Sequence, residues 1–287
     1  MQPRPIDHLV IAVRDLDRAR EAFARLGFTL TPVARHPFGT SNSLAQLQGS
    51  FVELLAVTDP DRIVETTAEE FSFGGFNRHF LKHREGISML ALKSADAEAD
   101  RAAFAGRGLP VYAPFHFSRT ARGPDGSERE VAFSLAFTSD ARMPEAGFFT
   151  CEHHFPENFW SLDWQRHENG ALHVETAIME AGDPADIHEF LTFFTGQHDI
   201  ESTSLGIDFD LGGGHLEVMS PVASKAFLGI APDVGMHPRF VGMRIAVADL
   251  GATRELLSAN GVGFAERSGA LVVPPAEACG AALAFVG

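Results

Sequence analysis

The sequence predicts an α+β fold of four tandem βαβββ modules, each with one strand, one helix and about three more strands. Three observations predict this fold. A strand followed by a helix recurs four times along the 287 residues. The fragments IAVRDL at 11–16 and IAVADL at 245–250 match at five of six positions. Shorter strand-like runs, bounded by turn residues, follow each helix. Such units cannot bury their sheets alone, so we expect them to pair into two curved sheets with concave ligand-binding faces.

The first module covers residues 6–57. Its opening strand is HLVIAV at 8–13, and a helix is expected over 15–28, ended by Gly27. The helix is indicated by apolar residues at helical spacing, namely Leu16, Ala19, Phe23 and Leu26. Three strands are then expected in LTPVAR, GTSNSLAQLQ and FVELLAV.

The same order predicts modules at 86–155, 171–220 and 239–287. We expect the first two to form an N-terminal domain over 1–160 and the last two a C-terminal domain over 161–287. The intervening segments 58–85, 155–170 and 221–238 are rich in polar residues, Pro or Gly, and are interpreted as irregular connections.

The composition excludes several classes of partner. A formal net charge of −15, without any Lys/Arg cluster, repels phosphate backbones and argues against nucleic-acid binding. Cys151 and Cys279 form no CxxC pair, which favours a reducing compartment. No segment is apolar enough for a signal peptide or a membrane span. We therefore expect a cytoplasmic monomer or homodimer whose partner is a small molecule.

Charged side chains and histidines inside apolar strands are the candidate functional residues. His8 and Glu53 lie in the first and last strands of module one, 45 residues apart, and His173 and Glu217 lie 44 apart in module three. The last strand of module two carries His153. A buried carboxylate must be paired, protonated or metal-bound. Metal ligation is therefore one explanation for these residues, and an arginine partner for either glutamate is the competing one.

These residues resemble the vicinal oxygen chelate superfamily, which includes glyoxalase I, extradiol dioxygenases and bleomycin-resistance proteins. The closest likeness is to the glyoxalase-like domain family. That family opens with an Asp-His strand, followed by a His-Pro…Gly-Thr-x-Asn run and an Arg…Pro-Asp-Gly run. The matching residues here are Asp7-His8, His36-Pro37-Phe38-Gly39-Thr40-Ser41-Asn42, and Arg119 with Pro124, Asp125 and Gly126. The resemblance covers residues 6–160 well and rests on the repeat pattern beyond them.

The resemblance implies half-open barrels around a divalent metal, whose identity could be Fe(II), Mn, Ni or Zn. Module two has Ser88 in place of the first-strand histidine, and module four has Gly242 and about Leu283 at the ligand positions. The metal ligands would come from His8, Glu53, His153, His173 and Glu217. Three arrangements stay open: His8, Glu53 and His153; or His153, His173 and Glu217; or His8, Glu53, His173 and Glu217 around one ion.

The resemblance also implies a small substrate whose adjacent oxygens chelate the metal. The reaction would be of the lyase, isomerase or dioxygenase class, with Glu53, Glu217 or His153 as catalytic proton carrier where it does not ligate. Residues expected to line the substrate pocket are His36, Asn42, Arg119, His154 and Trp160. The alternative is a non-catalytic binding protein of the bleomycin-resistance type. Convergence of three or more of the five candidate ligands would favour the enzyme. Candidate ligands that are scattered or paired with arginines would favour the binding protein.

Overall fold

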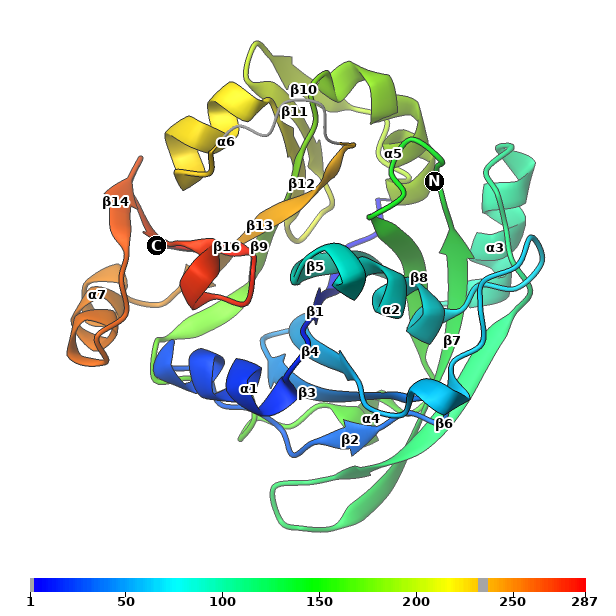
Figure 1. Cartoon of the computed structure of the whole chain (residues 1–287), viewed down its shortest axis with the longest axis horizontal. Coiled ribbons are helices and arrows are strands. Elements are labelled where there is room, and N and C mark those ends of the chain that lie inside the picture. Colours follow the sequence, from blue (N-terminus) through cyan, green and yellow to red (C-terminus); the bar gives the residue numbers. More distant parts are fainter. Residues whose placement is uncertain (1–2, 232–236) are drawn as a thin grey trace.

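The computed structural model describes residues 3–231 and 237–287 and confirms the predicted α+β fold of two curved sheets (Figure 1). Each sheet has eight strands. The first has the order β2-β3-β4-β1-β5-β8-β7-β6 and the second β10-β11-β12-β9-β13-β16-β15-β14. Modules one and two therefore share the first sheet, and modules three and four share the second.

Both sheets have the same topology, with antiparallel first strands of two modules at the centre. The strands of the first sheet are β1 (Ile6–Ala12), β2 (Ala34–Arg35), β3 (Thr40–Gln46), β4 (Phe51–Val57), β5 (Gly86–Lys93), β6 (Phe115–Arg122), β7 (Glu128–Thr138) and β8 (Gly147–His153). Those of the second are β9 (Ala171–Glu180), β10 (Ile200–Thr203), β11 (Gly206–Asp210), β12 (His215–Met219), β13 (Arg239–Val247), β14 (Ala265–Arg267), β15 (Ala270–Val273) and β16 (Ala282–Val286).

Four helices follow the first strands of the modules, as the repeat predicts. They are α1 (Leu16–Arg25), α3 (Ala97–Gly106), α5 (His188–Thr195) and α7 (Leu250–Ala259). Asp15 caps α1 by accepting a hydrogen bond from the Arg18 backbone, and Asp96 and Asp249 cap α3 and α7 in the same way. Gly27, with φ of +86°, follows the α1 C-terminus as expected for a glycine stop.

All three segments interpreted as irregular contain a helix. The connection 58–85 holds α2 (Phe73–His83), and 221–238 holds α6 (Pro221–Leu228), although residues 232–236 of the latter lie outside the described part of the chain. Both helices begin after a serine whose side chain accepts a backbone hydrogen bond. The Gly-Gly pair in α2 and the flanking Pro and Gly of α6 concealed the helical pattern. The connection 155–170 holds the one-turn helix α4 (Pro156–Phe159).

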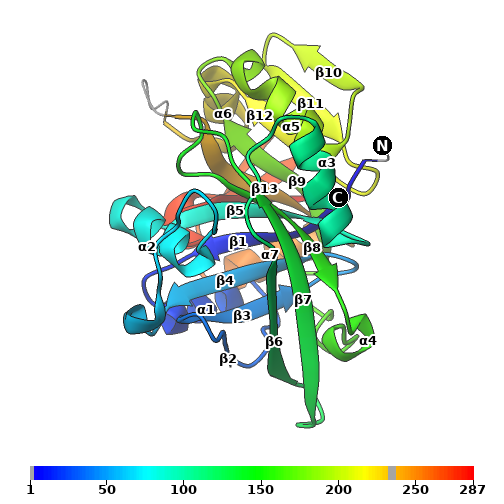
Figure 2. The ribbon, with the colours of Figure 1, turned by 90° about the vertical axis from the view of Figure 1, so that its right-hand side faces the viewer.

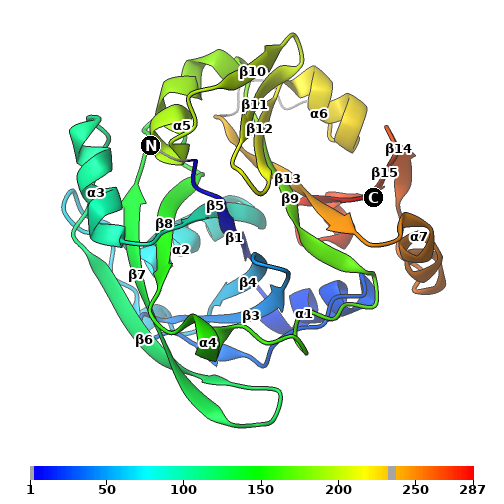
Figure 3. The same ribbon diagram turned by 180° about the vertical axis from the view of Figure 1, so that it is seen from behind.

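The convex faces of the two sheets share one hydrophobic core. Leu9 and Ile11 of β1 point into it, while their neighbours on the strand point to the concave face. The four module helices each contribute a large apolar side chain to this core: Phe23, Phe104, Phe194 and Leu257. Burying each such side chain contributes roughly 1.5–3 kcal/mol. Figures 2 and 3 show the sheets side by side, each with its own open concave face.

Within the described residues, none of the helices has the length and apolar character needed to cross a bilayer.

Candidate functional site

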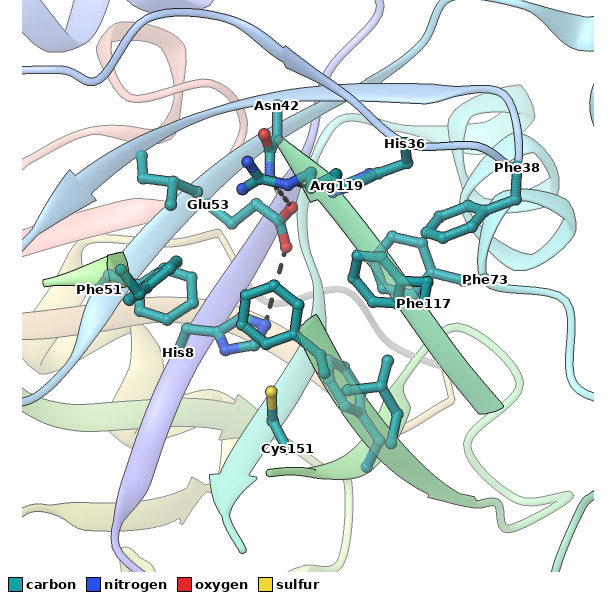
Figure 4. Close-up of a pocket in the computed structure, with 15 residues that line it drawn as sticks. His8, His36, Phe38, Asn42, Phe51, Glu53, Phe73, Phe117, Arg119 and Cys151 are labelled. Atoms are coloured by element: carbon teal, nitrogen blue, oxygen red, sulfur yellow. Dashed lines mark hydrogen bonds and ion pairs between the residues drawn. The ribbon is translucent and has the colours of Figure 1, made fainter. Parts of the chain in front are cut away.

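The concave face of the first sheet holds a pocket with an aromatic wall and a small group of polar side chains (Figure 4). Its free space in this structure is that of a few water molecules. The apolar lining consists of Phe38, Leu44, Phe51, Phe73, Phe117, Phe133, Leu135, Phe149 and Phe159. The polar lining consists of His8, His36, Asn42, Glu53, Arg119 and Cys151. The candidate residues His8, His36, Asn42, Glu53 and Arg119 are thus brought together.

A β-bulge positions His8. The register of β1 against β5 shifts between Ile6 and His8, so Asp7 is the extra residue of the bulge. The Asp7 carboxylate accepts a hydrogen bond from His8 Nδ1 at 2.6 Å. Burial alone would raise the pKa of Asp7, but the charges and hydrogen bonds of His153 and His8 lower it well below its usual range. An ionised Asp7 fixes the His8 tautomer, which leaves Nε2 as a bare acceptor facing the pocket.

Glu53 lies on β4, two residues beyond Phe51, the register partner of His8. Its Oε2 atom is 3.7 Å from His8 Nε2, and its Oε1 accepts a hydrogen bond from Asn42 Nδ2 at 2.6 Å. Burial raises the pKa of Glu53, and the charge of His8, the Asn42 hydrogen bond and the charge of Arg119 oppose that rise. The carboxylate is therefore costly to ionise in this buried pocket.

Arg119 brings a positive charge to the same pocket from β6. Figure 4 shows its guanidinium beside Asn42 and Glu53. Burial lowers the pKa of Arg119, an effect that Glu53 partly offsets. Its Nε atom is buried and has no hydrogen-bond partner among the described residues. The pocket therefore offers an incoming anion an unsatisfied donor.

His36 is held neutral beside these charges. Burial, reinforced by the charges of Arg119 and His8, lowers its pKa to about 3. Its Nδ1 contacts Thr40 Oγ1 at 2.8 Å, and its Nε2 faces Asn42 Nδ2 at 3.3 Å. These contacts suit one neutral tautomer, with Nδ1 donating and Nε2 accepting.

The lowered pKa of His36 predicts a specific pH dependence of stability. Between about pH 3 and its ordinary pKa of 6.5 the unfolded chain binds more protons at this residue than the folded chain. The free energy of unfolding therefore rises with pH over that range. We expect His36→Gln to lose less stability than the wild type between pH 6.5 and pH 4.5 in urea unfolding. Parallel pH curves for the two proteins would contradict this assignment.

Module two does not repeat the His8–Glu53 pair. His8 pairs with Phe51 across β1 and β4, and Met89 pairs with Gly147 across β5 and β8. The helix cap Asp15 follows His8 by the same number of residues as the helix cap Asp96 follows Met89. The position matching His8 is therefore Met89 rather than Ser88, and the position matching Glu53 is Phe149. Ser88 instead donates a hydrogen bond to Asn77 Oδ1 at 2.7 Å.

His173 and Glu217 lie in the second sheet, away from this pocket. The register of β9 against β12 pairs Thr176 with His215, so Thr176 matches His8 and His173 lies three residues before it. The 44-residue spacing to Glu217 is therefore coincidental. His173 is half-exposed and contacts Glu175 at 3.1 Å. Glu217 does match Glu53, but it pairs with Arg244.

Only one of the three predicted ligand arrangements keeps its members in one sheet, that of His8, Glu53 and His153. The other two require modules of different sheets to meet on one concave face, which the topology does not allow. In module four, Gly242 pairs with Ala282 across β13 and β16, so the position matching Glu53 is Ala284 rather than Leu283.

His153 joins the site through Asp7 and does not line the pocket. Its Nε2 atom lies 3.1 Å from Asp7 Oδ1, and its Nδ1 is buried without a partner among the described residues. Ligand atoms of Asp7, Cys151 and His153 lie within 4.8 Å of one another, a group that could hold a metal ion. Trp160 stacks on His153 at 6.0 Å between ring centroids and lines the groove outside the pocket.

His154 points away from His153, as the alternation of a strand predicts. Its Nε2 contacts Ser134 Oγ at 2.6 Å. The 25 phenylalanines of the chain indicate an aromatic cavity for the binding-protein alternative, whereas the sequence gives Asp7 no role of its own. The Asp-His pair at the strand start was a usable signal for Asp7, but only the bulge places both side chains on one face.

The side chains around His8 and Glu53 fit a divalent metal ion. His8 Nε2 and Glu53 Oε2 are close enough for both to lie about 2.1 Å from one ion. His8 is hydrogen-bonded through Nδ1 to the Asp7 carboxylate, as is typical of metal-binding histidines. The buried Oδ1 of Asn42 has no partner among the described residues. Imidazole and carboxylate suit Mn, Fe, Ni and Zn. These residues fit an ion with two strong protein ligands and several positions left for ligand oxygens.

Comparisons with known proteins agree with this architecture. No curated protein sequence matches the chain. A protein of undescribed function from Staphylococcus aureus has a TM-score of 0.70 at 16% identity, covering 98% of both chains. A mutant of 4-hydroxymandelate synthase from Streptomyces coelicolor has a TM-score of 0.56 at 15% identity, covering 94% of this chain and 78% of that one.

A Mn(II)-bound glyoxalase from Novosphingobium aromaticivorans has a TM-score of 0.57 at 11% identity, covering 99% of this chain and 82% of that one. At these identities the structures show the shared fold alone. The sequence itself matches the model of the glyoxalase-like domain over residues 6–194, about two thirds of its length. The chain belongs to the glyoxalase-like domain family, within the vicinal oxygen chelate superfamily.

Proposed function

We propose that the chain is a divalent-metal-dependent enzyme acting on a small molecule with adjacent oxygens in the pocket of the first sheet. The observation that carries this proposal is the convergence of His8 Nε2 and Glu53 Oε2 at 3.7 Å, with Asp7 behind His8. Glu217, at the matching position of module three, is paired with Arg244, whereas Glu53 contacts His8 and accepts a hydrogen bond from Asn42. Among the solved structures with this fold, a glyoxalase is described as Mn(II)-bound.

When bound, the ion would supply Lewis-acid polarisation of the substrate oxygens. His8 and Glu53 would hold it, and Asn42 would orient the Glu53 carboxylate. Arg119, whose guanidinium lies beside Asn42 and Glu53, would stabilise negative charge on the substrate. The phenylalanine lining excludes water and strengthens these interactions.

His153 is our candidate for moving a proton. It does not face an ion held by His8 and Glu53, and its Nδ1 atom lacks a partner among the described residues. Its Nε2 is hydrogen-bonded to Asp7, which also contacts His8, so His153 would act on the pocket through Asp7 rather than by touching the substrate. His36 is a weaker candidate, because its pKa of about 3 makes it a poor base at neutral pH.

The enzyme proposal is tested by proton exchange. The protein, loaded in turn with Mn(II), Fe(II), Ni(II) or Zn(II), would be incubated in D₂O with small 2-oxo acids and hydroxyketones and followed by proton NMR. An isomerase or lyase of this type is expected to exchange the hydrogen next to the carbonyl, and His153→Gln is expected to slow exchange more than it weakens binding. A parallel oxygen-uptake assay with Fe(II) detects the dioxygenase class.

A non-catalytic binding protein is the second candidate, and a specific observation favours it. Of the five predicted ligands only His8 and Glu53 converge directly, fewer than the three that would favour the enzyme, and Glu217 is paired with Arg244. Module two contributes Met89 and Phe149 at the matching positions. A binding protein would saturate with such compounds while producing neither hydrogen exchange nor oxygen uptake with any metal. That result would overturn the enzyme proposal.

A further inference from the structure

A wide groove lies outside the pocket, at the mouth of the first half-barrel. It is bounded by β2, by the β6–β7 hairpin and by the segment that follows α4. Figures 2 and 3 show this hairpin extending beyond the rest of the sheet. Arg119 lines both the groove and the inner pocket, so the two spaces meet at its side chain.

The groove concentrates positive charge in an acidic protein. The chain has a formal net charge of −15, yet four arginines and only three acidic residues line the groove. The arginines are Arg35, Arg119, Arg122 and Arg129, and the acidic residues are Asp125, Glu128 and Asp163.

The arginines at the groove are available to a ligand. Arg122 and Arg129 face Glu128 and Asp125 at 3.3 and 3.4 Å, in exposed pairs of the kind that contribute little. Arg35 makes no ion pair within residues 3–231 and 237–287. An anionic ligand can therefore recruit these side chains without breaking a strong native interaction.

The sizes of the two spaces constrain what can bind. The inner pocket has room for a few water-sized groups, whereas the groove holds much more free space. A molecule of more than a few heavy atoms that reaches His8 and Glu53 must therefore place its remaining atoms in the groove. Both tryptophans of the chain, Trp160 and Trp164, line that groove and offer apolar surface to the same molecule.

We infer that the groove binds the anionic portion of an extended small molecule, a carboxylate or a phosphate, while its reactive end enters the pocket past Arg119. This inference rests on the proposed function for the identity of the reactive end, but not for the groove itself. Arg119 lies where the anionic portion of the molecule would meet its reactive end. Its positive charge favours a negatively charged group at that point.

The test uses the tryptophans as reporters, because both lie in the groove. Metal-free protein, prepared with a chelator at low ionic strength, would be titrated with benzoate, with phenyl phosphate and with neutral benzamide while fluorescence is excited at 295 nm. We expect the two anions to quench emission saturably and benzamide to bind at least tenfold more weakly. The tighter of benzoate and phenyl phosphate identifies the preferred anion.

Three variants locate the effect. Arg119→Gln is expected to weaken anion binding about tenfold, and the double variant Arg35→Gln/Arg122→Gln by a further measurable factor. Arg101→Gln on α3 removes the same charge far from the groove and should bind like the wild type. Circular dichroism checks that each variant is folded.

Any of three results would overturn the inference. One is equal binding of benzamide and benzoate, and a second is anion binding that appears only with metal and ignores the groove arginines. The second result would leave the proposed metal-dependent function intact. The experiment therefore distinguishes failure of the groove proposal from failure of the metal-site proposal. Absence of quenching by every probe also counts against the groove.

Discussion

Replacing Glu53 by glutamine is expected to weaken divalent-metal binding by about 100-fold or more. The substitution keeps the size of the side chain and its contact with Asn42, but it removes one of the two strong ligands and its negative charge. Binding of Mn(II) measured by electron paramagnetic resonance reports the free ion directly. Unchanged affinity would remove Glu53 from the metal site.

The same substitution is expected to stabilise the metal-free protein by roughly 1–2 kcal/mol at pH 7, because a buried carboxylate is costly to ionise. Burial raises the pKa of Glu53 in the folded state, so ionisation at neutral pH opposes folding. Urea unfolding after chelation measures this. A gain in stability together with a loss of metal is the pattern expected of a functional carboxylate.

Glu217→Gln is the matched control. Glu217 occupies the position in module three that corresponds to Glu53, but its partner is Arg244 and its side chain is one quarter exposed. We expect no change in metal affinity and a change in stability within about 1 kcal/mol. A large effect of Glu217→Gln on metal binding would mean that the second sheet contributes to the site.

Replacing Asp7 by asparagine is expected to destabilise the protein by about 3–5 kcal/mol, the largest loss of stability that we expect. Asp7 is 2% exposed and serves as acceptor for both His8 and His153. The amide cannot accept from both imidazoles as a charged group does, and one ring is left without a partner. Chemical denaturation of wild type and variant at pH 7 measures the difference.

Asp7→Asn is also expected to lower metal affinity by about 10–100-fold, since Asp7 fixes the tautomer of His8. Asp208→Asn is the control, because Asp208 contacts His215 at 2.8 Å in a half-exposed pair of the second sheet. Its replacement should cost less than about 1 kcal/mol and leave metal binding unchanged. Equal effects of the two substitutions would show that Asp7 has no special role.

The fold could be predicted from the sequence because each copy of the repeat shows the same local pattern of residues. The strand–Asp–helix order in IAVRDL and IAVADL depends on alternation, capping and helical spacing, which neighbouring residues determine. The helices α2 and α6 were missed because their glycines and prolines carry the signals of loops. Tertiary packing stabilises these helices, and the sequence alone does not reveal that packing.

The site was predictable only in part. The buried pair of His8 and Glu53 could be identified because polar residues stand out in apolar strands. His173 resembles His8 in its spacing to a later glutamate, 44 residues against 45, but strand register decides which residues face one another. A one-residue shift also separates Ser88 from Met89, and the bulge at Asp7 changes the face of a side chain. These features depend on pairing between strands far apart in the chain.

The most direct test of the metal site is the metal content of three proteins. Wild type, His8→Ala and His173→Ala would be purified without chelators or a metal-affinity column, reconstituted with Fe(II), Mn(II), Ni(II) and Zn(II), and analysed by elemental mass spectrometry. We predict near-stoichiometric metal in wild type and in His173→Ala, and its loss in folded His8→Ala. Retention of metal in His8→Ala, or no metal in any of the three proteins, would contradict the proposed metal site.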